Sequence, residues 1–593
     1  MTADDPSLLD RLRQRKIVQW GIAYLAGAWL LLQLLDVLAP IVGLPLQFQR
    51  GVLVSAAIGL VLVVVLAWYH GERGRQRVSG PELLIVGGVL AIGAGALSLL
   101  PSGQAGGSDP TVGPPAGERS IAILPFTDYS PDRDQEYFGD GIAEELMSTV
   151  ARIPGLQVAA RTSSFAFKGS STDVREIGRV LGVANVVEGS VRKSADRLRI
   201  DARIVKVEDG FPLWQERFES DVSEVFEIQD RIANAVATAL ELQLGEESDA
   251  LVLPGQTSDH EAQDLYYRGR FDWNLRTREG LEAAVLSFRH ALDLDPGYAR
   301  ALAGLADSYA VLGFYDHRPP VEAFPLAREA ARQALELEGR LAEPHATLGY
   351  VALYYDWDWP EAEREFERAI QVNPAYPVAH QWYANYLVAM GRFGEAVDEM
   401  RRASELDPLS MIAHAALGWV HLYAGDPAAA AEQLQESLVR DRNFVVAYDW
   451  LGRALADAGR LDEGAAATER FAELSRHDAV SRAAVARLRA LQGRSDEARQ
   501  LLEQLDVEAR SSYVPSYEIA AAWVALDDAA MAIGWLERAY GERAHSLAFL
   551  AVDPRLRPLH GRGEFETLRS RLALDQVSRA VPDVPRRPSP QEG

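Results

Sequence analysis

The sequence predicts a multidomain chain: three transmembrane helices, then a small α/β domain, then an all-α solenoid of repeated helix pairs. Three observations lead to this fold class. Three apolar runs lie within the first hundred residues, alternating strand and helix patterns follow them, and a 34-residue period runs through the second half. At 593 residues the chain has room for several domains, and 48% hydrophobic residues suffice to build their cores.

Charge and cysteine content exclude several classes of function. The net charge of −25 argues against a general nucleic-acid binder, because phosphate contacts need a basic face. The chain has no cysteine, which excludes disulfides, thiolate nucleophiles and cysteine-ligated zinc. The absence of cysteine also fits a location outside the cytoplasm.

The first hundred residues predict three membrane spans, at 17–38, 51–69 and 83–100. Each run is close to the length that a helix needs to cross about 30 Å of hydrocarbon. Basic residues precede the first span and separate the second from the third: Arg11, Arg13, Arg15, Lys16, Arg73, Arg75 and Arg77. The positive-inside rule therefore predicts a multi-pass protein of the bacterial inner membrane, with residues 1–16 cytoplasmic and the C-terminal domains periplasmic.

A flexible linker, rich in proline and glycine, is predicted over residues 101–117, and an α/β domain over 118–245. The hydrophobic pattern predicts its elements in order. They are a strand at 121–126, a helix at 135–152, a strand at 156–161, a short helix at 173–181, strands at 184–194, 197–207 and 211–220, and a helix at 222–243. Short turns separate the last three strands, which predicts an antiparallel meander.

The strings IAILPF, YFGDGIAEEL, RIPGLQVAARTSSFAFKG, DVREIGRVLGVANVVEGSV, RLRIDARIV and DGFPLWQERF resemble the TolB-type amino-terminal domain. The resemblance covers about residues 120–243. It implies a small α/β interaction or assembly domain outside the cytoplasm, with no catalytic residues. Relatives often carry an adenylate cyclase or winged-helix domain before the membrane span, whereas this sequence has about sixteen residues there.

The segments ALDLDP, AIQVNP and ASELDP mark the 34-residue period, which predicts about eight stacked helix pairs over residues 246–541. Small residues recur at the eighth position and large ones at the twenty-fourth, as in the pairs Gly349 with Phe366 and Gly418 with Leu434. The pattern resembles the tetratricopeptide repeat. Residues 542–574 depart from it and are predicted to cap the solenoid, and residues 575–593 are predicted to be a disordered tail.

No motif nominates a catalytic residue, a cofactor site or a metal site. His345, His380 and His414 stand at the fourth position of successive units. Stacked helices lie about 8–10 Å apart, so equivalent histidines could not share one ion, and packing is the better interpretation.

Four residues are predicted to bind a partner: Tyr350, Gln381, Asn385 and Trp419. In the tetratricopeptide family the first helix of each unit lines a concave groove, and positions five and nine face it. Aromatic side chains there would be good anchors for a peptide. The alternative interpretation is that most of these rings fill the core between helices.

The function predicted is that of a membrane-anchored scaffold or sensor at the bacterial envelope, which binds protein partners through its repeat groove. The alternative is a regulatory subunit of a transmembrane signalling complex, associated with a cyclase or a regulator. Neither is an enzyme, neither uses a cofactor or binds nucleic acid, and self-association is left open.

Overall fold

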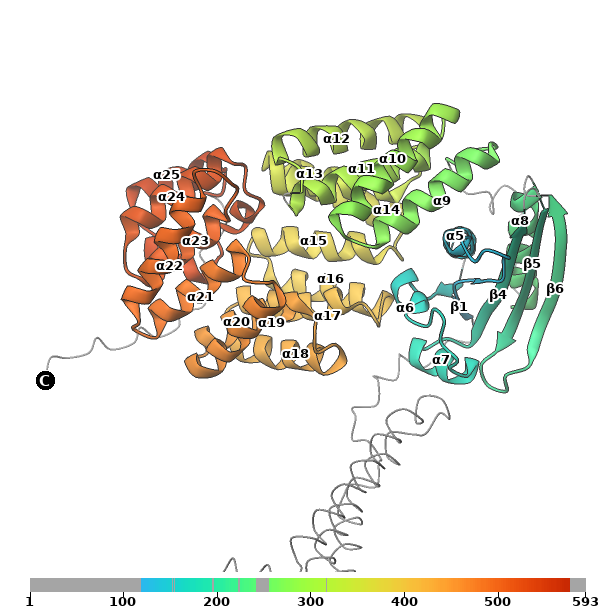
Figure 1. Ribbon diagram of the computed structural model, residues 1–593, viewed down its shortest axis with the longest axis horizontal. Helices are drawn as coiled ribbons and strands as arrows, with labels where there is room; N and C mark the ends of the chain where they lie inside the picture. Colours follow the sequence, from blue (N-terminus) through green and yellow to red (C-terminus); the bar gives the residue numbers. More distant parts are fainter. Residues whose placement is uncertain are drawn as a thin grey trace, which may run out of the picture. The chain divides into compact units, whose positions relative to one another are not determined.

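The computed structural model describes residues 119–240, apart from 152, 154, 195, 196, 222 and 223, and residues 255–577, apart from 316 and 576. All of them belong to one compact unit, Val112–Gly593 (Figure 1). The predictions for residues 1–16, for the linker 101–117 and for most of the tail 575–593 lie outside the described residues.

The fold class predicted from the sequence is wrong in its transmembrane part, and the multi-pass, membrane-embedded inner-membrane localisation fails with it. Within the described ranges, no helix is long and apolar enough to cross a lipid bilayer. The longest of these helices has 18 residues and carries glutamate and arginine side chains, whereas a span needs about 20 mostly apolar residues. The segments 17–38, 51–69 and 83–100 lie outside the described residues.

The α/β domain is built on one mixed sheet of order β3-β1-β4-β5-β6, with β2 also paired to β4. Its strands are β1 (Ser120–Ile123), β2 (Thr127–Asp128), β3 (Gln157–Val158), β4 (Asn185–Ser194), β5 (Arg197–Lys206) and β6 (Pro212–Asp221). Strand β1 runs parallel to β3 and β4. Strands β4, β5 and β6 form the antiparallel meander that the turn pattern predicted, so that prediction is confirmed.

Helices cover both faces of the sheet near β1. They are α5 (Glu136–Val150), α6 (Arg161–Phe165), α7 (Val174–Leu181) and α8 (Val225–Ala239). Apolar residues of α5 and α8, such as Ile142 and Ile232, pack with Ile123 and Ile200 in one core. Helix α7 closes a smaller core on the opposite face, where Ile177 meets neighbours from β1 and β4.

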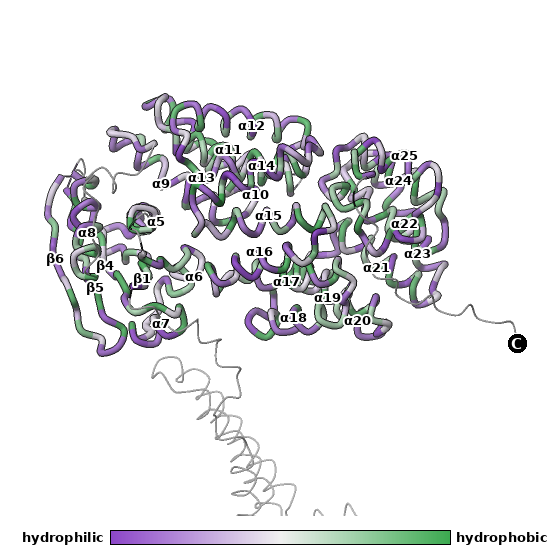
Figure 2. The backbone as a smooth tube through the Cα atoms, turned by 180° about the vertical axis from the view of Figure 1, so that it is seen from behind, coloured by the Kyte–Doolittle hydropathy of each residue, from purple (hydrophilic) through white to green (hydrophobic). Residues whose placement is uncertain are grey.

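Within residues 255–541, sixteen α-helices form eight successive pairs. They are α9 (His260–Asn274), α10 (Arg278–Leu294), α11 (Ala299–Phe314), α12 (Pro320–Leu337), α13 (Ala342–Val351), α14 (Trp359–Val372), α15 (Pro377–Ala389), α16 (Phe393–Leu406), α17 (Met411–Tyr423), α18 (Pro427–Arg440), α19 (Val445–Asp457), α20 (Leu461–Leu474), α21 (Ala479–Leu491), α22 (Ser495–Glu508), α23 (Ser516–Ala525) and α24 (Ala529–Gly541). A π-helical turn, η3 (Ala352–Asp356), continues α13. Polar and apolar residues mix along many of the helices, including α10, α12 and α14, as helices with one buried face require (Figure 2).

Small residues bring the two helices of a unit together, as their spacing predicted. A Cβ atom added to Gly349 would lie 2.8 Å from the Phe366 ring, and one added to Gly418 would lie 2.7 Å from the Leu434 side chain. Both distances are too short for real atoms, so position eight must be small where position twenty-four is large.

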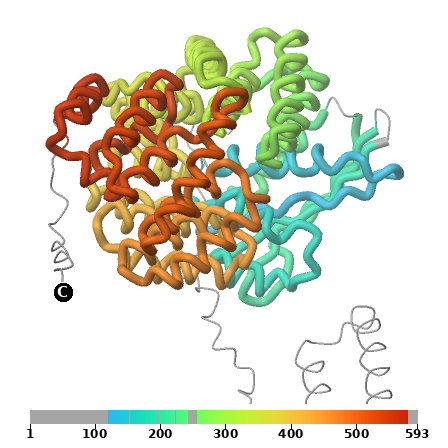
Figure 3. Tube along the Cα trace, turned by 60° about the vertical axis from the view of Figure 1, so that its left-hand side comes forward, coloured from blue at the N-terminus to red at the C-terminus, as the bar shows by residue number. Residues whose placement is uncertain are grey.

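The last segment contains two 3-10 helices, η4 (His545–Phe549) and η5 (Pro554–Leu559), and then α25 (Gly563–Arg571). It does more than cover the final unit. It turns back and contacts η3, α15 and α23, which belong to units as early as the third (Figure 3). We refer to residues 545–577 as the returning segment.

The α/β domain docks on the repeats at two places. At the first, Glu144 Oε2 accepts a hydrogen bond of 3.2 Å from Arg270 Nε of α9, and the ring of Tyr267 leaves no room for a Cβ atom at Gly141. At the second, the Ser163 hydroxyl donates a 2.6 Å hydrogen bond to Asp407, which ends α16. Since the first docking point lies on the first unit and the second on the fourth, the domain spans part of the array.

Candidate functional site: the inner surface of the repeats

The first helices of successive units contact one another, and their ninth positions share one surface, which we call the inner surface. Seven ninth positions follow the repeat: Arg270, Asp307, Tyr350, Asn385, Trp419, Arg453 and Arg487. The surface is therefore polar at its N-terminal end, aromatic in the middle and charged at its C-terminal end.

The aromatic part is filled by the chain itself. Phe549 of η4 packs edge-on against Trp419, with ring centroids 5.1 Å apart, and lies 6.2 Å from Tyr354. His545 of the same turn lies 4.3 Å from the Phe314 ring. Phe549 is 6% exposed, so the returning segment occupies the surface that a peptide would need.

Burial lowers the pKa of His545 to about 4, because no solvent is left to stabilise an imidazolium. The ring is therefore neutral at pH 7 and acts as an aromatic packing group.

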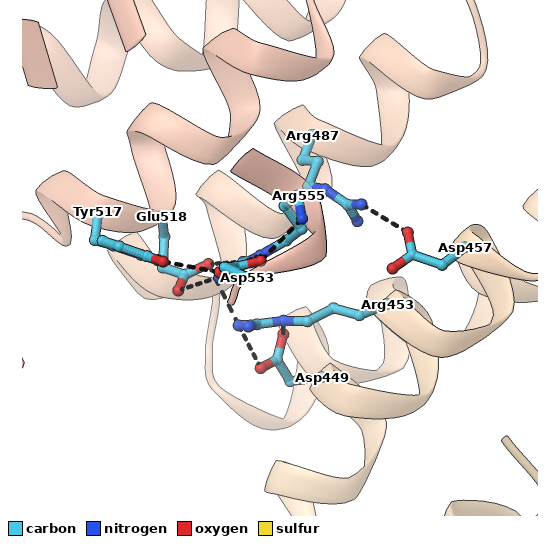
Figure 4. Close-up of polar contacts among 8 residues, drawn as sticks. All are labelled: Asp449, Arg453, Asp457, Arg487, Tyr517, Glu518, Asp553 and Arg555. Carbon is cyan, nitrogen blue, oxygen red and sulfur yellow. Dashed lines mark hydrogen bonds and ion pairs between the residues drawn. The ribbon is translucent and has the colours of Figure 1, made fainter. Parts of the chain in front are cut away.

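The charged part holds an ion network that ties the returning segment to the repeats (Figure 4). Arg555 of η5 pairs with Asp553 at 2.7 Å and also with Glu518 of α23. Arg453 of α19 joins the network through Glu518 and through Asp449, at 2.7 Å. Burial alone would raise the pKa of Glu518, but the two guanidinium groups outweigh it and lower that pKa to about 2.

A small pocket lies against this network, and its lining includes Arg453, Thr468, Arg487, Glu518 and Arg555. Its free volume of about 10 Å³ is roughly what one water molecule needs. The carboxylates around it already neutralise the guanidinium groups, including Arg487, which pairs with Asp457 at 3.0 Å. The pocket is therefore too small and too well compensated to serve as a reaction centre for an organic substrate.

The N-terminal part of the inner surface is polar, and its charges are only partly compensated by neighbouring groups. Asp307 is buried, bonds to the Thr347 hydroxyl and lies 4.0 Å from Arg270. Burial raises the pKa of Asp307 to about 6 despite these partners. Arg276, in the turn after α9, stacks its guanidinium 3.5 Å over the Trp273 ring.

Arg276 stands out because it is exposed and makes no ion pair within the described residues. Its backbone adopts a left-handed conformation, with φ of 54°. Burial raises the pKa of Tyr350, on α13, and of Tyr376, just before α15, and the positive charge of Arg276 opposes that rise. The guanidinium therefore lies on the side of the repeats where α13 and the start of α15 lie.

The four residues predicted to bind a partner divide into two classes. Tyr350 is 5% exposed, with its ring 4.4 Å from Trp382, and Trp419 is 8% exposed beneath Phe549. Gln381 and Asn385 are half-buried on α15. Asn385 hydrogen-bonds Tyr354, whereas Gln381 has no hydrogen-bond partner among the described residues. The partner role of all four remains a prediction.

The histidine column follows the packing interpretation. His345 Nδ1 lies 2.6 Å from Glu365, His380 Nδ1 lies 2.6 Å from Glu399, and His414 Nε2 lies 2.7 Å from the Pro408 carbonyl. Each ring is therefore held by its own repeat unit. Over the ranges that the structure describes, no cluster of His, Asp and Glu could hold a metal ion.

The sequence reasoning missed Arg276 and the charged network. Arg453 and Arg487 follow Trp419 by 34 and 68 residues, so extending the ninth-position series would have found them. Arg276 lies in the turn between α9 and α10, where no position of the repeat pattern marks it, and only its spacing of three from Trp273 indicates a contact. Nothing in the sequence places Asp553 and Arg555 beside α19.

Comparison with known proteins agrees with the repeats. Residues 351–410 and 383–444 match the tetratricopeptide repeat family model. A protein of Rhizobium meliloti (strain 1021) named putative adenylate cyclase 3 is 35% identical over 241 residues, which is 40% of each chain. The match thus spans well under half of that relative's length.

Solved structures of repeat proteins resemble parts of the chain. Pseudomonas aeruginosa pilF is 24% identical, covers 35% of this chain and 93% of its own, and has a TM-score of 0.28. YrrB, described as a TPR protein with an unusual peptide-binding site, is 18% identical, covers 35% and 99%, and has a TM-score of 0.24. The human IFIT1 dimer with m7Gppp-AAAA is 14% identical, covers 53% and 77%, and has a TM-score of 0.37.

The helix pairs, their packing glycines and the family match together define the class: residues 351–444 are tetratricopeptide repeats.

Proposed function

We propose that the chain is a protein-interaction scaffold that takes a segment of a partner protein on the open part of its inner surface. Support comes from the division of that surface. Its aromatic and charged parts are filled by the returning segment. The open part is marked by Gln381 and Arg276, whose side chains have no hydrogen-bond or ion-pair partner in the described chain.

The chemistry of the open part indicates what kind of segment fits. A half-buried amide such as that of Gln381 can donate to and accept from a peptide backbone, which satisfies both of its polar groups. The exposed guanidinium of Arg276 suits a carboxylate, since charge-assisted pairs are the stronger hydrogen bonds. The partner segment is therefore polar and acidic, and it does not need a large aromatic anchor.

The experiment compares partner recovery by the full-length protein and two variants after cross-linking in cells. Arg276→Ala with Gln381→Ala should lower the recovered amount of specific partners at least tenfold, which is about 1.4 kcal/mol of binding free energy. Gln371→Ala, which removes an exposed amide on the second helix α14, is the matched control and should recover the wild-type amount. Equal recovery by all three proteins would overturn the proposal.

Residues 118–245 are proposed to be a TolB-type amino-terminal domain that helps to assemble the scaffold. The support is the order of strands and helices together with the sequence strings that resemble this family. The domain docks on α9 and on the end of α16. This docking fits an assembly role, because it holds in place the units that carry the open part of the inner surface. The variant Ser163→Ala should then loosen the second docking point, visible as faster hydrogen exchange around Leu409.

A second candidate function is regulation of a nucleotide cyclase, supported by the 35% identity to the protein named putative adenylate cyclase 3. In this role the scaffold binds the cyclase or its regulator and does not turn over nucleotide. The purified protein should show background cyclase activity with ATP and divalent metal. Activity well above background that disappears on a point substitution in this chain would contradict the non-catalytic role.

A further inference from the structure

We propose that two copies of this chain associate by pairing their β6 strands edge to edge in an antiparallel arrangement. Strand β6 is the last strand of the sheet, bonded to β5 on one side only. It lies outermost in the α/β domain, and no described element lies beyond it (Figures 1 and 2).

The outer edge of β6 is long and unpaired within the described chain. In an antiparallel strand, alternate residues direct their N–H and C=O groups away from the neighbour. Strand β6 has ten residues, and every second one directs its N–H and C=O groups to the outer edge, so these groups form a row along the strand. Proline lacks an N–H group, but Pro212 is only the first residue of the strand. Outside the ladder, the hairpin turn before β6 holds a backbone hydrogen bond, which Lys206 N–H donates to the Phe211 carbonyl.

The side chains select a second copy as the occupant. Residues 215, 217, 219 and 221 share the face that is not covered by α8, and all are exposed. If Phe218 stands opposite Phe218 of a second copy, Arg217 lies opposite Glu219 at two equivalent positions. Opposite charges across a strand pair are stabilising, and like charges are destabilising.

The neighbouring registers are disfavoured by the same rule. Shifting the two-fold axis to Arg217 would bring two guanidinium groups together, and shifting it to Glu219 would oppose two carboxylates. Only the register centred on Phe218 makes this part of β6 complementary to itself, as an isologous interface requires. Arg217 and Glu219 keep their pairs with β5, at 2.6 and 2.7 Å, and each retains an exposed side.

The first test measures self-association of the full-length protein by sedimentation over a concentration series. Arg217→Glu should weaken the dimer on the order of tenfold, since two attractive pairs become repulsive. Combining it with Glu219→Arg restores complementarity and should restore the dimer. Arg203→Glu, on the same face of β5 but one strand inward, is the matched control and should dimerise as the wild type does.

The second test uses the absence of native cysteine to read the register. Gln215→Cys with Asp221→Cys places each thiol opposite its partner's other thiol in the Phe218-centred register. Within one chain these positions lie about 20 Å apart, beyond disulfide reach. Mild oxidation should give a covalent dimer, whereas Gln215→Cys with Glu219→Cys, which reports the register centred on Arg217, should not.

A wild-type protein that stays monomeric throughout the series would overturn the proposal. So would a dimer that is indifferent to Arg217→Glu, or cross-links that form in the shifted register. If β6 pairs with a different protein instead, the chain is monomeric and the β6 amides are protected from hydrogen exchange only when that protein is present. This result would also contradict the proposal.

Discussion

Arg555 is the residue on which the returning segment depends most. Its side chain is 5% exposed and contacts two buried carboxylates, on Asp553 and Glu518. Arg555→Met keeps the length of the side chain but leaves both carboxylates uncompensated. Breaking a buried ion pair in this way costs about 3–5 kcal/mol. Chemical unfolding should show that loss, whereas Arg402→Ala, which breaks an exposed pair, should cost about 1 kcal/mol or less.

His545 predicts a pH dependence of stability with a definite sign. Its pKa is depressed to about 4 in the folded protein, below the unfolded value, so the unfolded state binds the proton more tightly. The contribution of neutral His545 to the free energy of unfolding is complete above about pH 6.5 and is lost as the pH falls toward 4. This loss is at most about 3 kcal/mol. Relative to His545→Phe, which removes the titration and keeps a ring, the wild type should lose stability over that range. A constant difference between the two proteins would show that the ring is not buried in solution.

Residues with a repeating role could be read from the sequence, and residues with a unique role could not. The packing of Gly349 and Gly418 against large side chains follows from the 34-residue spacing and is confirmed. Trp419 was expected to face a groove, but Phe549, 130 residues later, covers it. No local pattern encodes a contact between segments so far apart, since it depends on how the whole array bends.

At the level of the elements, the turn inside each of the last five helix pairs repeats a left-handed residue. Gly391, Gly425, Gly459 and Gly493 have φ between 71° and 84°, and Asp527 takes the next place in the series with φ of 58°. A non-glycine residue in this conformation is strained by about 1 kcal/mol. Asp527→Gly should therefore raise the stability by up to that amount. In the reverse change, Gly493→Asp, the new Cβ atom would have no other atom within 4 Å, so only the backbone strain is added. This change should lower the stability by a similar amount in thermal unfolding.

If Asp527→Gly destabilises the protein, a side-chain contact of Asp527 outweighs the backbone strain. The same series shows that the turn chemistry repeats with the 34-residue period. Helix α6 was missed, because five residues are too few to show a helical period.

At the scale of the whole molecule, the contact between Gly141 of α5 and Tyr267 of α9 couples the α/β domain to the repeats. A Cβ atom at Gly141 would lie 2.2 Å from the Tyr267 ring, so Gly141→Ala forces the two apart. Overpacking of this kind costs about 1–3 kcal/mol. Gly534→Ala, in open space on helix α24, should be neutral or stabilising in the same unfolding experiment. Equal effects of the two changes would mean that the domain is not docked in solution.

The domain order of the described chain could be predicted because each domain has its own period, two in the strands and 34 in the repeats. The closure of the array could not be predicted, because it joins Asp553 to α23 and Phe549 to α17 through contacts that no period repeats. The transmembrane fold class rested on runs of apolar residues, and no helix of the described ranges is long and apolar enough to bear it out.

Binding of partners to the open part of the inner surface can be measured directly. The most direct measurement places a photo-cross-linking residue at Gln381 in the full-length protein, and at Val439, which is 72% exposed on helix α18, as the control. Illumination in cells should give specific cross-linked partners from position 381, and Arg276→Ala should reduce them. Partners captured at position 439 but not at 381 would contradict binding at the inner surface.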